Sequence, residues 1–280
     1  MRTALTVALM VIALFESGFE LTASRRAPQK SDWDAAAAEV RAGFRPGDLI
    51  VTAPTWADPI GRSAIGDLVS VEMAGHADTD RYARIWELSI RGAHAPETTG
   101  SSIERVISTN EHGRVTVTLY QKKAANVLYD FTSHAADARI VQGEHPCHPS
   151  GPATPGRFNC AGVTIEPRTL EIDYLPRRGI LAPVDGQKTT SIEFADVTLG
   201  SSLAGHMGLH DYYSRKNADG PVDFIVFIDG KSTLTTRYLQ KENWRSFNIA
   251  TAPGLHTVRF DIASPAPAWR TFGFHAESRQ

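Results

Sequence analysis

Residues 222–230 read VDFIVFIDG, in which an apolar run from Phe224 to Ile228 is followed directly by Asp229 and Gly230. Aspartate and glycine both tolerate the left-handed backbone that the two central residues of a tight hairpin turn require. An apolar run that ends at such a dipeptide is typical of a buried strand that turns back on itself. The stretch therefore predicts an antiparallel hairpin inside a β-structure.

Short strands are also predicted on both sides of this hairpin, with turns between them. The candidate strands are residues 192–194, 222–228, 244–249, 258–262 and 272–274. Helix signals fade after about residue 125, and regular short strands punctuated by Gly and Pro are typical of sandwiches and barrels. Residues 125–280 are therefore expected to form an antiparallel, jelly-roll-like β-sandwich. Its predicted core includes Ile192, Phe194, Phe224, Val226, Phe260 and Phe274.

Residues 31–124 differ, because helix and strand patterns alternate along them. An alanine-rich run after Ser31 predicts a capped helix that stops at Gly43. Further elements are predicted as strands at residues 49–53, 84–90 and 115–119, and as a helix at residues 101–109. Such alternation indicates a small layered α/β module. The predicted fold class is thus an α+β chain of two modules, with the boundary between residues 124 and 125.

Residues 1–30 form a separate segment with the pattern of an export signal. Arg2 precedes an almost unbroken apolar run at residues 4–15, and acidic Glu16 and Glu20 follow it. A short basic start with an apolar run of this length is typical of secretory signals, whereas a membrane span needs about 20 apolar residues. The segment predicts a signal peptide or a membrane anchor. The charge bias predicts that the body of the chain is extracytoplasmic, periplasmic or at the cell surface.

The chain contains two cysteines, Cys147 and Cys160, in a Pro/Gly-rich loop at residues 143–160. Outside the cytoplasm, a lone pair this close in sequence predicts a structural disulfide. Two free thiols remain an alternative. A metal site that adds His145 and His148 is a third, although these histidines flank Cys147 too closely for the usual ligand spacing.

Composition and motifs exclude several classes of function. The net charge is −2 and both signs alternate along the chain, which argues against a nucleic-acid partner. The chain contains neither a GxSxG nor an HExxH motif, so no catalytic residue and no metal is predicted. Residues 217–220 resemble part of a calcium loop, but Arg215 stands at the first ligand position and the closing acid is missing. No cofactor is therefore predicted, and a structural calcium in another geometry stays open as an alternative.

Short motifs of the first half carry a family resemblance. They are Asp32-Trp33, Pro46-Gly47-Asp48, Arg84-Ile85-Trp86 and the strand at residues 115–120. On these motifs the first half resembles the soluble C-terminal part of protein O-mannosyltransferase-like polytopic glycosyltransferases. The catalytic acid of that family lies in a loop between membrane spans, which this sequence does not show. The resemblance therefore implies an accessory role linked to glycosyl transfer rather than transferase activity.

The second half is similar to jelly-roll carbohydrate-binding modules that accompany glycan enzymes. The similarity lies in residues 191–194, 205–209, the hairpin at 222–230, Trp244 and residues 258–260. It implies a carbohydrate as ligand. Trp244 itself is expected to pack in the core.

A candidate binding site follows from the sequence GHMGLHDYY at residues 205–213. Gly205 and Gly208 favour a loop at the rim of the sandwich, and sugar recognition needs an aromatic face beside hydrogen-bonding groups. The predicted binding residues are His206, His210, Asp211, Tyr212, Tyr213 and Arg215. Histidines spaced like His206 and His210 share a metal reliably only on a helix, so this pair is not assigned to one.

The sequence thus predicts an exported or membrane-tethered, non-catalytic protein of the cell envelope. It would bind a carbohydrate or a partner protein of the envelope, with its N-terminal segment as the contact to the membrane. The alternative is an enzyme that acts on envelope polysaccharide, a glycoside hydrolase or a transferase-related protein. It would use the histidines or a carboxylate pair such as Asp223 and Asp229.

Overall fold

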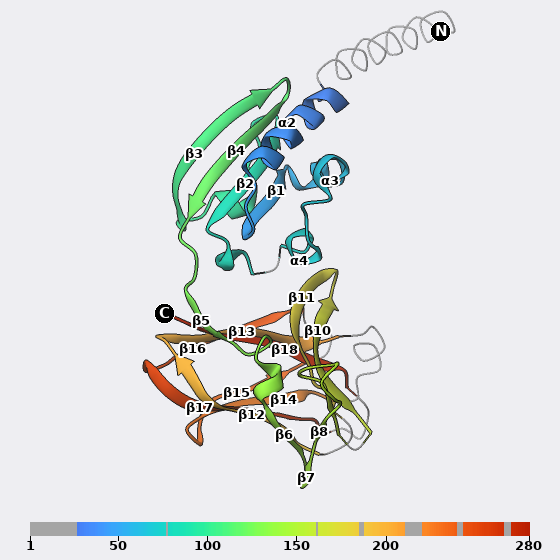
Figure 1. Ribbon diagram of the computed structural model, residues 1–280, viewed down its shortest axis with the longest axis vertical. Coiled ribbons are helices and arrows are strands. Elements are labelled where there is room, and N and C mark those ends of the chain that lie inside the picture. The colour runs from blue at the N-terminus through green and yellow to red at the C-terminus, as the bar shows by residue number, and fades with distance from the viewer. Residues whose placement is uncertain are drawn as a thin grey trace, which may run out of the picture. The chain divides into compact units, whose positions relative to one another are not determined.

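The computed structural model describes residues 27–76, 78–160, 162–184, 188–210, 220–239, 243–265 and 270–280 (Figure 1). The chain forms two compact units. The first comprises residues up to Ser70 together with Tyr82–Ala124, and the second comprises Val71–Arg81 and Ala125–Gln280. Val71–Arg81, which lies within the predicted first module, therefore belongs to the second unit.

Residues 1–26 of the predicted signal peptide or membrane anchor lie outside the described residues. Among the residues that the structure does describe, no helix has the length and apolar character needed to cross a membrane.

A helix packed on a four-stranded sheet forms the first unit. The strand order is β1-β2-β4-β3, in which only β1 and β2 run parallel. The elements are α2 (Lys30–Gly43), β1 (Asp48–Ala53), α3 (Asp58–Ile65), β2 (Arg84–Ile90), β3 (Ile103–His112) and β4 (Val115–Lys122). Helix α2 buries Trp33, Ala36, Ala37 and Val40, which the helical period places on one face.

Two details of this unit differ from the sequence prediction. The cap of α2 is Gln29 rather than Ser31, and the Gln29 backbone N–H donates to the Asp32 carboxylate at 3.0 Å. Residues 101–109 were expected to be helical but lie largely in strand β3, which pairs with β4. β-Branched side chains such as those of Val106 and Ile107 favour a strand, and both are exposed on this edge.

The second unit contains an eight-stranded and a six-stranded sheet, which confirms the predicted antiparallel β-sandwich. The larger sheet has the order β16-β13-β18-β11-β10-β9-β8, and β5 also pairs with β18. Its strands are β5 (Val127–Asp130), β8 (His148–Pro149), β9 (Phe158–Asn159), β10 (Thr164–Ile172), β11 (Leu175–Leu181), β13 (Ser202–Leu209), β16 (Arg245–Ala250) and β18 (Phe272–Arg279). The smaller sheet has the order β15-β14-β17-β12-β6-β7. Its strands are β6 (Arg139–Gln142), β7 (His145–Pro146), β12 (Thr190–Leu199), β14 (Val222–Ile228), β15 (Lys231–Tyr238) and β17 (Gly254–Ala263).

The hairpin at residues 222–230 forms as predicted. Strand β14 turns into β15 through Asp229 and Gly230, whose φ angles are 51° and 78°. Strand β14 lies inside its sheet, between the edge strand β15 and β17. Its apolar side chains contribute to a core in which all six predicted core residues are fully buried. Aromatic rings pack closely in this core, with the rings of Phe224 and Phe274 5.4 Å apart.

Cys147 and Cys160 form a disulfide with their Cα atoms 4.5 Å apart, as the sequence predicted. Both thiols are used in this bond, so the alternatives of free thiols and of a metal site with His145 and His148 do not apply. The cysteines also pack against the hydrophobic core of the sandwich. The bridge therefore fixes the Pro/Gly-rich loop to the core.

Replacing both cysteines with serine is expected to lower the free energy of unfolding by about 3 kcal/mol, because the unfolded chain regains the entropy of an open loop. The bridged residues are 13 positions apart. Equilibrium urea denaturation of both proteins measures the difference. Equal stability of the variant and the oxidised wild type would show that the bridge contributes nothing.

Candidate binding site on the second unit

The candidate site lies on the outer face of the eight-stranded sheet, opposite the sandwich core. Side chains alternate along β18, so Phe272 and Phe274 face the core while His275 and Glu277 face the other side. His206 on β13 lies in register with His275 on β18 and with Ser246 on β16. Three adjacent strands therefore place two histidines and a serine in one row.

The segment Val71–Arg81 adds charged side chains to this face. Its short helix α4 (Val71–Ala74) is followed by Gly75, which packs so closely on Pro176 of β11 that a Cβ atom would lie 2.3 Å from the proline ring. The chain then reaches Asp78, whose φ of 51° is left-handed. This path brings Asp78 and Arg81 to the row of histidines.

A partly buried charge network anchors the segment to the sheet, with the Arg81 side chain 34% exposed. The Arg81 Nε–H donates to Glu277 Oε2 at 2.7 Å, and Arg81 Nη2 donates to Asp130 Oδ2 at 3.0 Å. Arg279 binds the other oxygen of Glu277. Glu277 is fully buried, and these two partly exposed guanidinium groups compensate its charge.

The same arginine determines the tautomer of His275. Arg81 Nη2 lies 3.1 Å from His275 Nε2 and can only donate, so Nε2 accepts and Nδ1 carries the hydrogen. Nδ1 is buried and has no hydrogen-bond partner among the described residues, since Asp78 Oδ2 is 3.9 Å away. Burial, together with the charge of Arg81, lowers the pKa of His275 to about 3. The ring is therefore neutral at neutral pH.

His206 is neutral for similar reasons. Burial lowers its pKa to about 3, and the nearby Arg177 and Arg279 charges act in the same direction. Its Nδ1 is buried without a hydrogen bond to the described part of the chain, 3.8 Å from Asp78 Oδ1. Asp78 also forms an ion pair with Arg177, and the Arg177 guanidinium lies 5.5 Å from the centroid of the Trp244 ring.

Asp78, His206 and His275 resemble a set of metal ligands, because one ligand-type atom of each lies within 4.8 Å of the others. The hydrogen on His275 Nδ1 removes the lone pair that a metal would need. Arg177 also occupies the carboxylate of Asp78 with a positive charge. The chemistry of the cluster therefore suits a hydrogen-bonded ligand better than a cation.

Asp78, His206 and Arg177 face an open, largely polar pocket of about 300 Å³. It is lined by His76, Asp78, Thr79, Asp80, Arg177, Ala204, Gly205, His206, Ser246, Phe247, Asn248 and Arg279. Guanidinium, carboxylate, amide and hydroxyl groups thus converge on one small space.

The residues predicted as a binding site are only partly brought together. His206 lines the pocket, whereas His210 Nδ1 accepts a hydrogen bond at 3.0 Å from the backbone N–H of Glu171 on β10. His210 therefore ties two strands of the sheet together and does not line the pocket. The remaining predicted residues lie outside the described residues; they are Asp211, Tyr212, Tyr213 and Arg215.

The predicted rim loop at Gly205 and Gly208 is corrected by the structure, because both glycines lie within strand β13. A Cβ atom on Gly205 would lie 2.1 Å from the backbone oxygen of His275. One on Gly208 would lie 2.3 Å from Ile172 Cδ1. The glycines therefore permit close packing in the sheet rather than a loop.

Two further expectations concern Trp244 and the carboxylates. Trp244 was expected in the core but is half-buried, and its Nε1–H donates to the Leu175 backbone oxygen at 2.8 Å.

The two carboxylates of the alternative catalytic pair, Asp223 and Asp229, each bind a neighbouring group of the protein. Asp223 binds Arg237, and Asp229 accepts a hydrogen bond at 2.9 Å from the Thr257 backbone N–H at the hairpin turn.

Comparisons with known proteins find likeness only in solved structures. No protein-family model matches the chain, and no curated protein sequence matches it. The CBM51-2 and INT domains of Clostridium perfringens ZmpB match with a TM-score of 0.29 and 10% identity, over 41% of this chain and 26% of that one. This chain thus spans about a quarter of the length of that structure.

Two further structures match a larger share of their own length. The CBM51 of Clostridium perfringens GH95, solved in complex with methyl-galactose, has a TM-score of 0.29 and 11% identity over 41% of this chain and 79% of that one. The tandem CBM51 modules of the family 98 glycoside hydrolase of Streptococcus pneumoniae match with a TM-score of 0.34 and 13% identity. The match covers 61% of this chain and 56% of that one.

The neighbours in structure are thus carbohydrate-binding β-sandwich modules of low sequence identity. The comparisons give no support to the resemblance of the first half to O-mannosyltransferase-like enzymes.

Proposed function

We propose that the second unit binds a neutral saccharide in this pocket and that the protein is a non-catalytic binding protein. The observation that carries the proposal is that two residues lining the pocket hold buried polar atoms with no hydrogen-bond partner among the described residues: His206 Nδ1 and Arg177 Nε. Each such atom costs about 1–3 kcal/mol unless something in the pocket satisfies it. A bound ligand with several hydroxyl groups would satisfy them together.

The mixture of charges favours a neutral polyol over an ion. Asp78 and Asp80 would repel an anion, while Arg177 and Arg279 would repel a cation. Sugar hydroxyls both donate and accept, so they match donors such as the Arg177 guanidinium and acceptors such as the Asp78 carboxylate, both of which line the pocket. Phe247 is the aromatic residue among those that line the pocket.

The state of the acids supports binding rather than hydrolysis. A glycosidase needs a carboxylic acid whose pKa is raised so that it can protonate the leaving group. Burial alone would raise the pKa of Asp130, but Arg81 outweighs burial and lowers it. Glu277 is held between Arg81 and Arg279, and Asp78 binds Arg177.

An extracytoplasmic location is part of the proposal. A disulfide such as Cys147–Cys160 forms and persists in oxidising compartments. The apolar run at residues 4–15 would direct the chain there, either as a cleaved signal or as an anchor. Binding of an envelope glycan would follow from that location.

The proposal is tested by glycan-array retention of the whole protein, followed by calorimetry on any glycan retained. His206→Ala is expected to weaken binding by about tenfold or more, because a hydrogen bond to the ligand is lost. Its melting temperature should not fall, because His206 Nδ1 has no partner within the described residues.

The matched control is His210→Ala. It removes a histidine that directly follows strand β13, four residues after His206, and that does not line the pocket. This variant should retain the glycan at the wild-type level while losing some stability. No retention of any glycan by the wild type, or equal loss in the two variants, would show that the pocket is not a saccharide site.

A further inference from the structure

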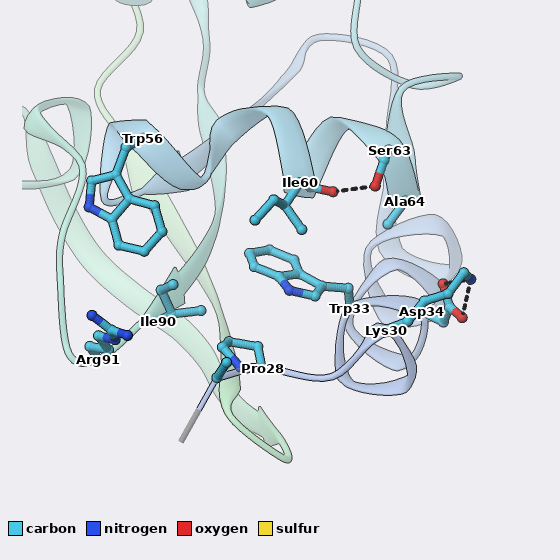
Figure 2. Close-up of a pocket in the computed structure, with 11 residues that line it drawn as sticks. Pro28, Lys30, Trp33, Asp34, Trp56, Ile60, Ser63, Ala64, Ile90 and Arg91 are labelled. Carbon is cyan, nitrogen blue, oxygen red and sulfur yellow. Dashed lines mark hydrogen bonds and ion pairs between the residues drawn. The ribbon is translucent and has the colours of Figure 1, made fainter. Parts of the chain in front are cut away.

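A second pocket, of about 330 Å³, lies in the first unit between helix α2, helix α3 and the end of strand β2 (Figure 2). It is lined by Ala27, Pro28, Lys30, Trp33, Asp34, Trp56, Ile60, Ser63, Ala64, Ile90 and Arg91. Figure 2 shows the indoles of Trp33 and Trp56 and the side chains of Ile60 and Ile90 around one common space.

The walls of this pocket are mainly apolar, unlike those of the saccharide pocket. Trp33 and Ile90 are buried and form its base, while Trp56 is 60% exposed and Ile60 47% exposed. Two large apolar side chains thus face solvent side by side although burial would stabilise them. An apolar ligand would cover both.

The charged groups at the rim of the pocket differ in whether a carboxylate of the protein neutralises them. Lys30 forms an ion pair with Asp34 at 2.6 Å, and the Ser63 hydroxyl donates to the Ile60 backbone oxygen at 2.7 Å. Arg91 lies with its guanidinium 5.7 Å from the centroid of the Trp56 ring and has no carboxylate partner among the described residues. One positive charge is therefore left for a ligand.

We propose that this pocket binds a small amphiphile that joins a compact apolar part, such as a ring, to an anionic group. The apolar part lies between Trp33, Trp56 and Ile60, and the carboxylate, phosphate or sulfonate pairs with Arg91. The volume of the pocket suits a small molecule rather than a helix of a partner protein. The polar side chains at its rim bind each other, so a neutral saccharide would find few partners here.

This inference is independent of the saccharide site, because it concerns another unit and another class of ligand. The test uses two fluorescent probes with the whole protein: anilinonaphthalene sulfonate, which is apolar and anionic, and phenylnaphthylamine, which is apolar and neutral. We expect saturable binding of the anionic probe at one site. Trp56→Ala should weaken binding of both probes by about tenfold, because it removes the exposed wall of the pocket.

Arg91→Gln separates the anionic part of the proposal from the apolar part. It should weaken the anionic probe by about tenfold and leave the affinity for the neutral probe unchanged. Matched controls are Ile107→Ala and Arg105→Gln, which change exposed residues of strand β3 in the same unit. Neither control should alter the affinity for either probe, and His206→Ala should not alter it either.

Each contrary outcome has a definite meaning. Absence of saturable binding by the wild type, or equal losses in the controls, would overturn the pocket as a ligand site. Loss of both probes in Arg91→Gln would overturn the assignment of Arg91 to an anion. Because Trp56 and Arg91 are exposed, all variants should keep the melting temperature of the wild type, which shows that weakened binding does not reflect unfolding.

Discussion

Acidification from pH 7 to pH 5 is expected to lower the free energy of unfolding by about 4 kcal/mol through His206 and His275 alone, about 2 kcal/mol from each. Both histidines have a folded-state pKa of about 3 against 6.5 for an ordinary histidine. As the pH falls below 6.5, the unfolded chain binds protons that the folded protein excludes. The stability that this difference provides is complete above pH 6.5 and is lost progressively toward pH 3.

Burial is the main reason for these low pKa values, and neighbouring charges adjust them. The charged groups around the two rings come from several elements: Asp78, Arg81, Asp130, Arg177, Glu277 and Arg279. Arg81 opposes protonation of His275, while Asp130 favours it. A protonated His275 would also face the donor of Arg81 instead of offering it a lone pair.

Urea denaturation at pH 7 and pH 5 tests this expectation. The double variant His206→Gln with His275→Gln should lose about 4 kcal/mol less than the wild type between these pH values. A glutamine oxygen can still accept the hydrogen bond from Arg81. His210→Gln changes a histidine outside the cluster and should behave like the wild type. A wild-type stability that is equal at both pH values would contradict the buried, neutral state of the two rings.

The strands of the sandwich were predictable because their patterns are local. The apolar run and Asp229-Gly230 turn at residues 222–230 determine a hairpin without reference to the rest of the chain. Strand β3 was mistaken for a helix for the opposite reason. It lies at an edge of its sheet with most residues exposed, so it lacks the alternation of buried and exposed residues that identifies a strand.

The candidate site was less predictable, because four distant parts of the chain supply it. Asp78, Arg177, His206 and His275 meet only through strand pairing and the path of Val71–Arg81. No local spacing connects them. One signal was visible in the sequence: Phe272, Phe274 and Ala276 alternate with His275, Glu277 and Arg279. That alternation extends the strand predicted at residues 272–274 to residue 279 and places three ionisable side chains on its outer face.

The glycines of β13 show how one residue type supports two interpretations. Gly205 and Gly208 suggested a loop because glycine is common in turns. Glycine inside a strand also marks a close approach of another segment, and the contact of Gly205 with the His275 backbone is of that kind. The sequence does not show which segment approaches, so the choice required the structure.

Replacing Arg81 with methionine is expected to lower the free energy of unfolding by about 3 kcal/mol, because it leaves the buried carboxylate of Glu277 short of a partner. Loss of one member of a buried ion pair costs about 3–5 kcal/mol. The lower value applies here because Arg279 still binds Glu277 and because the Arg81 side chain is itself 34% exposed. Urea denaturation measures the change. Arg237→Met breaks an exposed pair with Asp223 and serves as the matched control, with no measurable change expected.

Arg81 also holds the end of Val71–Arg81 on the sheet, so its loss should affect the pocket as well as stability. Hydrogen exchange of residues 71–81 should accelerate, and glycan retention should weaken because Asp78 is no longer held in position. Adding Glu277→Gln to Arg81→Met removes the buried charge of Glu277. Part of the lost free energy of unfolding should then return, while hydrogen exchange of residues 71–81 stays fast. If Arg81→Met were as stable as Arg237→Met, Arg279 alone would be sufficient for Glu277 and the segment would be held by other contacts.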